Sequence, residues 1–485
     1  MRLKDPTLLR QQCFVGGEWI GVPATDVTDP ATGAVIARVP YFGTAETKDA
    51  IAKAYAAFPG WAKLTGKARA AILRRWFELI IANRDDIGLI MTTEQGKPLA
   101  EAAGEVDYAA SFVEFNGEEA KRIYGEVSLS HREDARIVVI KQPIGVVGAI
   151  TPWNFPAAMI TRKAAPALAA GCTMVVKPAE QTPLSALAIG KLAEEAGLPP
   201  GVLGIVTGNA EDAPVIGRVL TSSPIVRKLG FTGSTEIGKL LMAQCAGQVK
   251  KISLELGGNA PFIVFDDADL DEAVAGALLC KFRNSGQTCI SANRILVQDG
   301  VFDEFVRRLT DEVARLPIGS GLEPETKVGP LIEQQAIDKV ERHVADALER
   351  GGELLTGGEH LGGLFYRPTV ITGVPSDAAM AREETFGPVA GIARFSSEAD
   401  AIRQANDTPY GLSAYFYSRD IGRVWRVSEG LEYGIVGINV GAVSTEIAPF
   451  GGVKESGIGR EGSKYGIDEW LEIKYLCMGG IEESL

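Results

Sequence analysis

Short apolar runs alternate strictly with segments of helical periodicity from Gly145 to Leu256. The segment Thr182–Gly197 opens with Thr-Pro and closes on glycine, which is typical of an amphipathic helix between two strands. Alternation at this spacing predicts parallel βαβ units and therefore a doubly wound α/β sheet. The predicted strands of this sheet are Val146–Thr151, Cys172–Lys177, Leu203–Thr207, Arg227–Phe231 and Lys251–Leu256.

A second α/β series begins after Gly258. It contains a strand at Pro261–Phe265, then a helix that opens on aspartates 266, 267 and 269, and its alternation continues to about Val440. Acidic residues in a first turn suit the positive end of the helix dipole. The Ala-rich segment Pro40–Tyr124 is mostly helical and is expected to pack against the first sheet. A chain of 485 residues has room for two such bodies.

Two segments fit neither body. Glu126–Pro143 contains the strand-like run Arg136–Lys141, and Trp470–Gly480 carries another apolar run. Two strands from such distant parts of the chain could pair and extend a sheet across a subunit contact. The alternative is an internal edge hairpin, and the sequence alone barely separates the two.

Charge limits the partners of this chain. The formal net charge is −13, from 62 acidic and 49 basic residues. A surface of this sign repels phosphate backbones and anionic lipid, so neither nucleic acid nor a membrane is an expected partner. No run approaches the ~18 consecutive apolar residues of a spanning helix, and Met1–Pro6 lacks the apolar stretch of a signal peptide. A cytoplasmic location is expected by default.

Histidine and cysteine are sparse. The three histidines have no ligand spacing and the six cysteines include no CxxC pair, so neither a metal site nor a disulfide framework is expected. Cys289 follows the polar, glycine-containing loop Asn284–Thr288. Reactive cysteines favour polar, partly exposed positions, so Cys289 is the candidate nucleophile. Four others lie in apolar runs typical of buried thiols: Cys172, Cys245, Cys280 and Cys477.

Two polar residues near strand ends are candidates for catalysis. Glu255 stands between two leucines at the end of a predicted strand. Burial should raise the pKa of such a carboxyl group, which suits a general base, although a salt-bridge partner is the alternative. Asn154 follows the first predicted strand, where its side-chain amide could donate to an oxyanion.

Glycine and serine at a helix start suggest a cofactor site. Gly233 ends a strand and Ser234 caps the next helix, whose backbone N–H groups could receive a pyrophosphate at the carboxyl edge of the sheet. Taken alone, an ordinary capped helix is the better interpretation. Glu180, just after Lys177, could accept hydrogen bonds from ribose hydroxyls or be a solvated helix-entry residue. Gly457–Gly462 matches GxGxxG but follows a loop, so it does not indicate dinucleotide binding.

The chain resembles the aldehyde dehydrogenase superfamily over almost its whole length. The resemblance implies the aldehyde dehydrogenase fold: a Rossmann-like NAD(P)-binding domain (1–125 and 144–257), an α/β catalytic domain (258–458) and a small β oligomerisation flap (126–143 and 468–485). It also implies a homotetramer or homodimer. The motifs are PWNFP at Pro152–Pro156, KPAEQTP at Lys177–Pro183, FTGSTEIG at Phe231–Gly238, LELGG at Leu254–Gly258, GQTC at Gly286–Cys289 and EETFGPV at Glu383–Val389.

The resemblance fits the roles already suggested for Cys289, Glu255 and Asn154 as nucleophile, deacylating base and oxyanion donor. It further implies that Glu384 and Phe386 lie at the nicotinamide-ribose end of NAD(P)+. The predicted cofactor site comprises Thr151, Trp153, Lys177, Glu180, Gly233, Ser234, Leu256, Glu384 and Phe386.

Within the superfamily, three segments resemble succinate-semialdehyde dehydrogenases: Met159–Lys163, Lys281–Asn284 and Arg460–Gly466. The predicted substrate is then an aldehyde with its own carboxylate. Arg162, eight residues after Asn154 and about two helical turns along, and Arg283, six before Cys289, could bind that carboxylate through their guanidinium groups. By resemblance, Ser444 adds a hydroxyl. The alternative for both arginines is a structural salt bridge.

Two positions depart from these enzymes. Ser291 stands where many of them have a second cysteine, so a redox switch of neighbouring cysteines is not available. Glu180 stands where NADP-preferring bacterial members tend to have serine. NAD+ is therefore favoured here, with some use of NADP+.

Other functions share parts of the pattern. Glutarate semialdehyde differs from succinate semialdehyde by one methylene, which is typically worth only ~1–3 kcal/mol of discrimination. A CoA-acylating dehydrogenase shares the nucleophile, but resembling enzymes lack a base at Glu255. A thiol hydrolase would not need the Rossmann series. A non-catalytic scaffold protein of the same fold is the non-enzymatic alternative.

Overall fold

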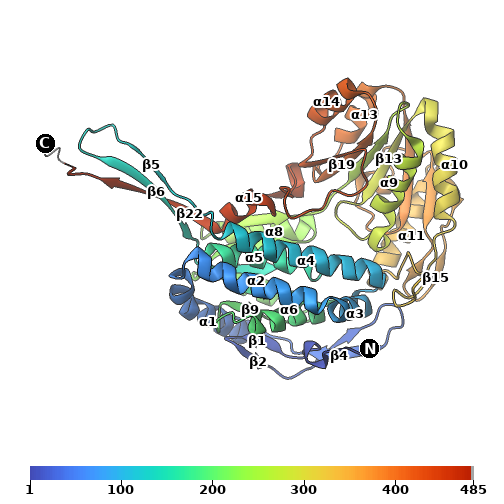
Figure 1. Ribbon diagram of the computed structural model, residues 1–485. Coiled ribbons are helices and arrows are strands. Elements are labelled where there is room, and N and C mark those ends of the chain that lie inside the picture. The colour runs from blue at the N-terminus through green and yellow to red at the C-terminus, as the bar shows by residue number, and fades with distance from the viewer. Residues whose placement is uncertain (482–485) are drawn as a thin grey trace.

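The structure, a computed structural model, describes residues 1–481. The last four residues of the predicted flap segment 468–485 lie outside the described residues. The chain forms two large sheets wrapped by helices and a narrow three-stranded sheet that projects from the body (Figure 1).

The first large sheet confirms the predicted doubly wound series. Its strand order is β2-β1-β9-β8-β7-β10-β11-β21, and its five predicted strands run parallel at the centre. These are β7 (Val146–Ile150), β8 (Thr173–Lys177), β9 (Leu203–Ile205), β10 (Val226–Thr232) and β11 (Lys251–Glu255). Antiparallel edge strands add β1 (Cys13–Val15), β2 (Glu18–Ile20) and β21 (Gly457–Ile458).

Helices pack against this sheet as predicted for the segment Pro40–Tyr124. Helix α5 is buried along its whole length because α4 and α2 pack on it, and its small residues permit close approach. Within residues 1–481, no helix is long and apolar enough to cross a membrane. The helices are α1 (Thr44–Ala62), α2 (Gly66–Ala82), α3 (Arg84–Gln95), α4 (Leu99–Glu119), α5 (Ala158–Ala170), α6 (Pro183–Glu195), α7 (Ala213–Ser222) and α8 (Thr235–Ala246).

The second large sheet has the order β14-β17-β18-β13-β12-β19-β20, and only β14 runs antiparallel to its neighbour. Its strands are β12 (Ala260–Val264), β13 (Ala292–Gln298), β14 (Glu353–Thr356), β17 (Thr369–Thr372), β18 (Val389–Phe395), β19 (Ser413–Tyr417) and β20 (Ile435–Ile438). The accompanying helices are α9 (Leu270–Phe282), α10 (Phe302–Val313), α11 (Gln334–Glu349), α12 (Ala379–Arg382), α13 (Glu398–Asn406) and α14 (Ile421–Gly430).

Short elements complete the fold. Two small hairpins pair β3 with β4 and β15 with β16, and a short helix precedes the last strand. Their bounds are β3 (Thr25–Thr28), β4 (Val35–Val39), β15 (His360–Gly362), β16 (Phe365–Tyr366) and α15 (Ser463–Gly466).

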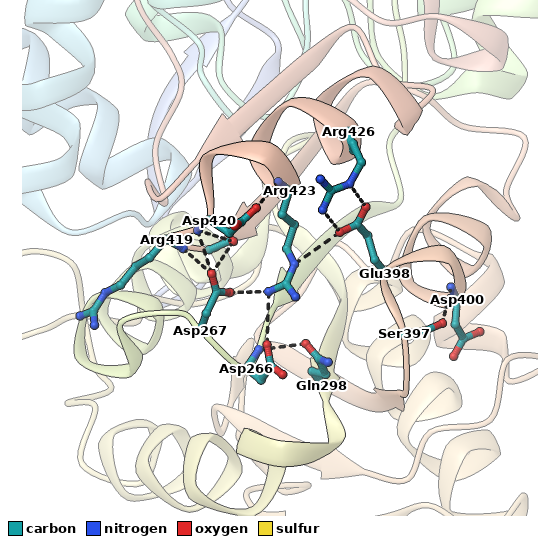
Figure 2. Close-up of polar contacts among 11 residues, drawn as sticks. Asp266, Asp267, Gln298, Ser397, Glu398, Asp400, Arg419, Asp420, Arg423 and Arg426 are labelled. Carbon is teal, nitrogen blue, oxygen red and sulfur yellow. Dashed lines mark hydrogen bonds and ion pairs between the residues drawn. The ribbon is translucent and has the colours of Figure 1, made fainter.

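The aspartates before α9 serve two purposes, which corrects the prediction that all three suit its dipole. Only Asp269 caps α9, where it accepts from two backbone N–H groups. Asp267 instead accepts from two N–H groups just before α14, and Asp266 and Asp267 both pair with Arg423 (Figure 2). These carboxylates therefore tie the end of β12 to α14.

The projecting sheet joins distant segments, which is one of the two alternatives that the sequence left open. β6 (Arg136–Pro143) pairs antiparallel with β22 (Leu471–Met478) along its full length, and β5 (Glu126–Leu129) pairs with the other edge of β6. Figure 1 shows this sheet extending away from both large sheets. Cys477 lies on it and is exposed, so its assignment as a buried thiol is wrong.

Candidate active site

Cys289 lies in the loop between α9 and β13. After Phe282 the chain turns through Asn284, Ser285 and Gly286, whose φ angles are +53°, +57° and +74°. Three successive residues in the left-handed region turn the chain sharply at the end of the helix. A Cβ at Gly258 would overlap the carbonyl oxygen of Cys289, so glycine permits the segment after β11 to lie against this loop.

Cys289 is partly buried and packs against the apolar cluster of Ile290, Leu412 and Phe450. Burial raises its pKa to about 12; Glu384 and Glu255 also raise it, while Arg162 lowers it. The neutral thiol therefore dominates near pH 7 in the protein alone. A thiolate nucleophile needs a further positive charge or a base close by.

Alkylation of Cys289 by iodoacetamide is expected to accelerate about tenfold per pH unit between pH 7 and 9, because the reagent reacts with the thiolate. Arg162→Gln should slow it at every pH, since Arg162 lowers the pKa of this thiol. Mass spectrometry of the Cys289 peptide, in a Cys477→Ser background that removes the exposed thiol, gives the rate. A rate that is flat across this range would mean that the thiolate already dominates at pH 7.

Glu255 ends β11 with its side chain buried, as predicted. Its Oε2 atom has no hydrogen-bond partner within the described residues. Burial and the neighbouring carboxylate of Glu461 raise the pKa of Glu255 well above 4.5, while Arg162 and Lys163 lower it. A carboxylate with a raised pKa is a stronger base than an ordinary carboxylate, which suits a general base.

Glu461 was not identified from the sequence. It is buried, with Oε1 2.5 Å from the Lys163 Nζ and Oε2 2.9 Å from the Arg162 Nη2. Although burial raises its pKa, Lys163 and Arg162 lower it overall. The two carboxylates therefore differ: Lys163 and Arg162 favour the ionised form of Glu461, whereas burial and the charge of Glu461 favour the protonated form of Glu255. The segment Arg460–Gly466 stood out only by its resemblance to succinate-semialdehyde dehydrogenases, and it has no apolar periodicity that would indicate the burial of Glu461.

Asn154 lies in the turn between β7 and α5. Its Nδ2 donates to the main-chain oxygen of Gln287 at 3.1 Å, two residues before Cys289. An amide NH₂ has two donors, so the second N–H is available for an oxyanion. Helix α5 begins only at Ala158, and the predicted spacing of two helical turns from Asn154 to Arg162 is therefore wrong, because the intervening residues form a turn.

The two arginines predicted to bind substrate differ in their surroundings. Arg162 is buried between the rings of Phe112 and Phe450, and it pairs with Glu461. Arg283 is half-buried over the ring of Phe155, 5.5 Å from its centroid, and makes no ion pair within residues 1–481.

Tyr108 lies close to both arginines and to Ser444. Burial raises the pKa of Tyr108, and Arg162 and Arg283 lower it. The Tyr108 hydroxyl and the Arg162 Nε are buried without a hydrogen-bond partner in the described part of the chain, whereas the Arg162 Nη2 faces the Glu461 carboxylate. Buried donors of this kind call for an acceptor, and a carboxylate supplies one. Tyr108 was missed because it lies on α4, far from the other residues in sequence.

The predicted cofactor residues lie at the carboxyl edge of the first sheet. Ser234 caps α8 by accepting from the N–H of Ile237, and Leu256 packs against Gly238 of the same helix. Lys177 and Glu180 form an ion pair of 2.8 Å beyond β8. The Thr151 hydroxyl is buried with no partner within residues 1–481.

Three further cofactor candidates come from two loops: Trp153 follows β7, and Glu384 and Phe386 precede β18. Burial raises the pKa of Glu384 to about 7, and its Oε1 accepts from the N–H of Gly258 at 3.1 Å. Trp153 and Phe386 meet edge to face, with ring centroids 5.5 Å apart. A helix N-terminus, ribose-hydroxyl acceptors and an aromatic pair fit the parts of a dinucleotide.

A separate cavity of about 860 Å³ lies against β13, β17 and β18, and several arginines line it, including Arg294, Arg382 and Arg394. None of the predicted site residues lines this cavity. It is therefore not part of the candidate active site.

A thiol, a buried carboxylate and an amide donor beside a doubly wound sheet are the groups that a thiol-dependent dehydrogenase requires. The model of the "Aldehyde dehydrogenase family" matches residues 19–476, and the chain belongs to this family of oxidoreductases. Both the predicted family and the predicted fold class are confirmed.

Individual relatives are similar over their full length. The chain is 61% identical to the glutarate-semialdehyde dehydrogenase of Pseudomonas aeruginosa, covering 99% of this chain and 100% of that protein. It is 60% identical, with the same coverage, to the NADP+ succinate-semialdehyde dehydrogenase of Escherichia coli. The crystal structure of succinate-semialdehyde dehydrogenase from Burkholderia pseudomallei matches with a TM-score of 0.97 at 59% identity, covering 99% of this chain and 100% of that one.

Proposed function

We propose that this protein oxidises succinate semialdehyde to succinate with NAD(P)+, through a thioester on Cys289. The observation that carries the substrate class is the set of buried or half-buried donors around Tyr108, Arg162 and Arg283. The names of the relatives support a semialdehyde with a distal carboxylate.

The chemistry follows from the order of groups. The thiolate of Cys289 attacks the aldehyde carbon, and the oxyanion accepts from the Asn154 side-chain amide and the Cys289 N–H. Such a donor is worth about 3 kcal/mol in comparable sites. NAD(P)+, when bound, would accept the hydride that the adduct loses as it becomes a thioester. Glu255 then takes a proton from the water that attacks the thioester, and the acid leaves as Cys289 is regenerated.

The cofactor would lie across the carboxyl edge of the first sheet. Gly233 and Ser234 at the start of α8 would receive the pyrophosphate, and Lys177 and Glu180 the adenosine ribose. Glu384, with Phe386, Trp153, Thr151 and Leu256, would bound the nicotinamide end. These groups fit the cofactor because their acceptors and donors match ribose hydroxyls and phosphate oxygens.

Arg283→Ala is expected to lower kcat/KM for succinate semialdehyde roughly ten- to a hundredfold, because a charge-assisted contact is worth on the order of 1.5–3 kcal/mol. The value of kcat/KM for butanal, which has no carboxylate, should fall little. Arg162→Ala should show the same selectivity with an additional loss for both aldehydes, since it also removes one of the two cations that pair with Glu461. Equal losses for the two aldehydes in Arg283→Ala would reassign this residue to structure.

Glutarate semialdehyde is the second candidate substrate, because the P. aeruginosa relative is named for it at 61% identity. One methylene changes discrimination by ~1–3 kcal/mol. Comparison of kcat/KM for the two semialdehydes with the wild-type protein tests which one is the better substrate. A tenfold preference for glutarate semialdehyde would make it the first candidate.

The cofactor preference is expected to favour NAD+ because the Glu180 carboxylate repels a 2′-phosphate, whereas Lys177 tolerates either. Glu180→Gln should raise kcat/KM for NADP+ relative to NAD+ by about tenfold, equivalent to ~1.4 kcal/mol. A strong NADP+ preference in the wild-type protein, unchanged by the substitution, would mean that Glu180 points away from the ribose.

We also propose the division into an NAD(P)-binding domain (1–125 and 144–257), a catalytic domain (258–458) and an oligomerisation flap (126–143 and 468–485). Exposed apolar side chains on the projecting sheet support a role in a homotetramer or homodimer: Val127, Leu129, Ile473, Tyr475 and Met478. A cytoplasmic location stays a prediction.

A further inference from the structure

Asn154 is held in place by hydrogen bonds from two other segments of the chain. Its main-chain oxygen accepts from the Lys97 Nζ at 2.7 Å and from the Asn284 Nδ2 at 3.1 Å. Lys97 comes from the connection between α3 and α4, and Asn284 from the loop that carries Cys289. One carbonyl oxygen therefore joins three separate segments.

The lysine is itself fixed. Lys97 is buried with Glu105, its Nζ 2.5 Å from the Glu105 Oε2, and it lies over the ring of Phe155. The other oxygen of Glu105 accepts from the N–H groups of Ala157 and Ala158 at the start of α5. The pair therefore holds both ends of the turn from Asn154 to Ala158.

The loop that carries Cys289 is held by hydrogen bonds within the same cluster of residues. The Asn284 Nδ2 also donates to the main-chain oxygen of Gln287 at 3.2 Å, the same oxygen that receives the Asn154 side-chain amide. Gln95, the last residue of α3, donates to the Asn284 Oδ1 at 3.0 Å and accepts from the Lys97 N–H at 3.0 Å. All of these groups are buried.

Position 284 requires both a residue that tolerates a positive φ angle and a side chain that can donate and accept hydrogen bonds. Its φ of +53° is a conformation that asparagine tolerates better than most residues. Its side chain meanwhile uses both amide hydrogens and the oxygen within this cluster. A buried network with every member satisfied is rigid, and it fixes geometry better than an apolar contact would.

We propose that Lys97, Glu105 and Asn284 are positioning residues that set the distance between the oxyanion amide of Asn154 and the sulfur of Cys289. This inference rests on the proposed function, in which Asn154 holds the oxyanion. The alternative is that the three residues only stabilise the fold, as a buried ion pair and a turn residue often do.

A double-mutant cycle separates positioning from stability. The measurement is the rate of the first NAD(P)H burst with succinate semialdehyde, in the full-length protein. Lys97→Met should slow the burst roughly ten- to a hundredfold, because a misplacement of about 1 Å can cost that much. In an Asn154→Ala background, the same change should cost less than about threefold, since the amide that it positions is gone.

Asn284→Gly provides a second arm if Lys97→Met fails to fold, because glycine keeps the backbone conformation and removes the side-chain donors. It should slow the burst while iodoacetamide alkylation of Cys289, which builds no oxyanion, stays within about twofold of wild type. Slower alkylation to the same extent as the burst would mean that the whole loop has moved, and it would overturn the proposal.

Glu94→Gln is the matched control. Glu94 is as buried as Glu105 and caps α6 in the way that Glu105 caps α5, accepting from Leu184 and Ser185 N–H groups at 2.7 Å. It should lower Tm and leave the burst rate unchanged. An equal burst loss in Glu94→Gln, or additive losses in the cycle, would overturn the positioning role. Full activity in Asn154→Ala would instead refute the oxyanion role itself, and the inference would fail with it.

Discussion

Cys289→Ala is expected to abolish aldehyde oxidation, with a loss on the order of a thousandfold or more, because no thioester can form without the sulfur. The side chain is partly exposed at the end of a loop, so its removal leaves no large cavity in the core. Fold and cofactor binding should survive. Absorbance at 340 nm with succinate semialdehyde and NAD(P)+ measures the loss, and thermal unfolding and cofactor titration check the rest.

Cys280→Ala is the matched control for this experiment. Cys280 is nine residues earlier, on α9, and burial raises the pKa of its thiol to about 11. It packs in the core of the second sheet, so its loss should cost stability rather than turnover. More than a tenth of wild-type activity in Cys289→Ala, or an equal loss in Cys280→Ala, would refute the assignment of the nucleophile.

The parallel strands of the first sheet were predictable because each is a short apolar run bounded by glycine, proline or a helix cap, whereas only β12 of the second sheet was placed individually. Strands β7 to β11 were placed within a few residues of their observed ends. The edge strands β1 and β2 were not predicted, because three-residue strands carry too little pattern. The β6–β22 pairing was predicted as one of two alternatives, since a strand's partner depends on the tertiary fold.

The candidate site was predictable where local sequence determines the environment. Glu255 was identified from its apolar flanks at a strand end, and Cys289 from its polar loop. Tyr108, Lys97 and Glu461 were not, because only the packing of α4, the α3–α4 connection and the C-terminal segment against α5 brings them to the site. The helical spacing predicted from Asn154 to Arg162 was wrong although the sequence carried a signal against it, because Pro156 disfavours the helical conformation at Phe155.

Glu255→Gln should separate the two halves of the reaction. Oxidation to the thioester does not need this carboxylate, so one rapid burst of NAD(P)H per site is expected. Turnover should then be slower by about a hundred- to ten-thousandfold, the usual contribution of a general base. Mass spectrometry should find the acyl group on Cys289. A normal steady state without an adduct would place the base elsewhere.

The pH dependence of deacylation tests whether Glu461 raises the pKa of Glu255. The base acts only when ionised, so deacylation in the wild-type protein should slow as the pH falls through this raised pKa. Glu461→Gln removes the carboxylate that raises it and leaves Arg162 and Lys163, which lower it, so the acidic limb should move to lower pH. The residual turnover of Glu255→Gln should have no such limb. An acidic limb that stays in place in Glu461→Gln would mean that the two carboxylates do not interact in the acyl-enzyme.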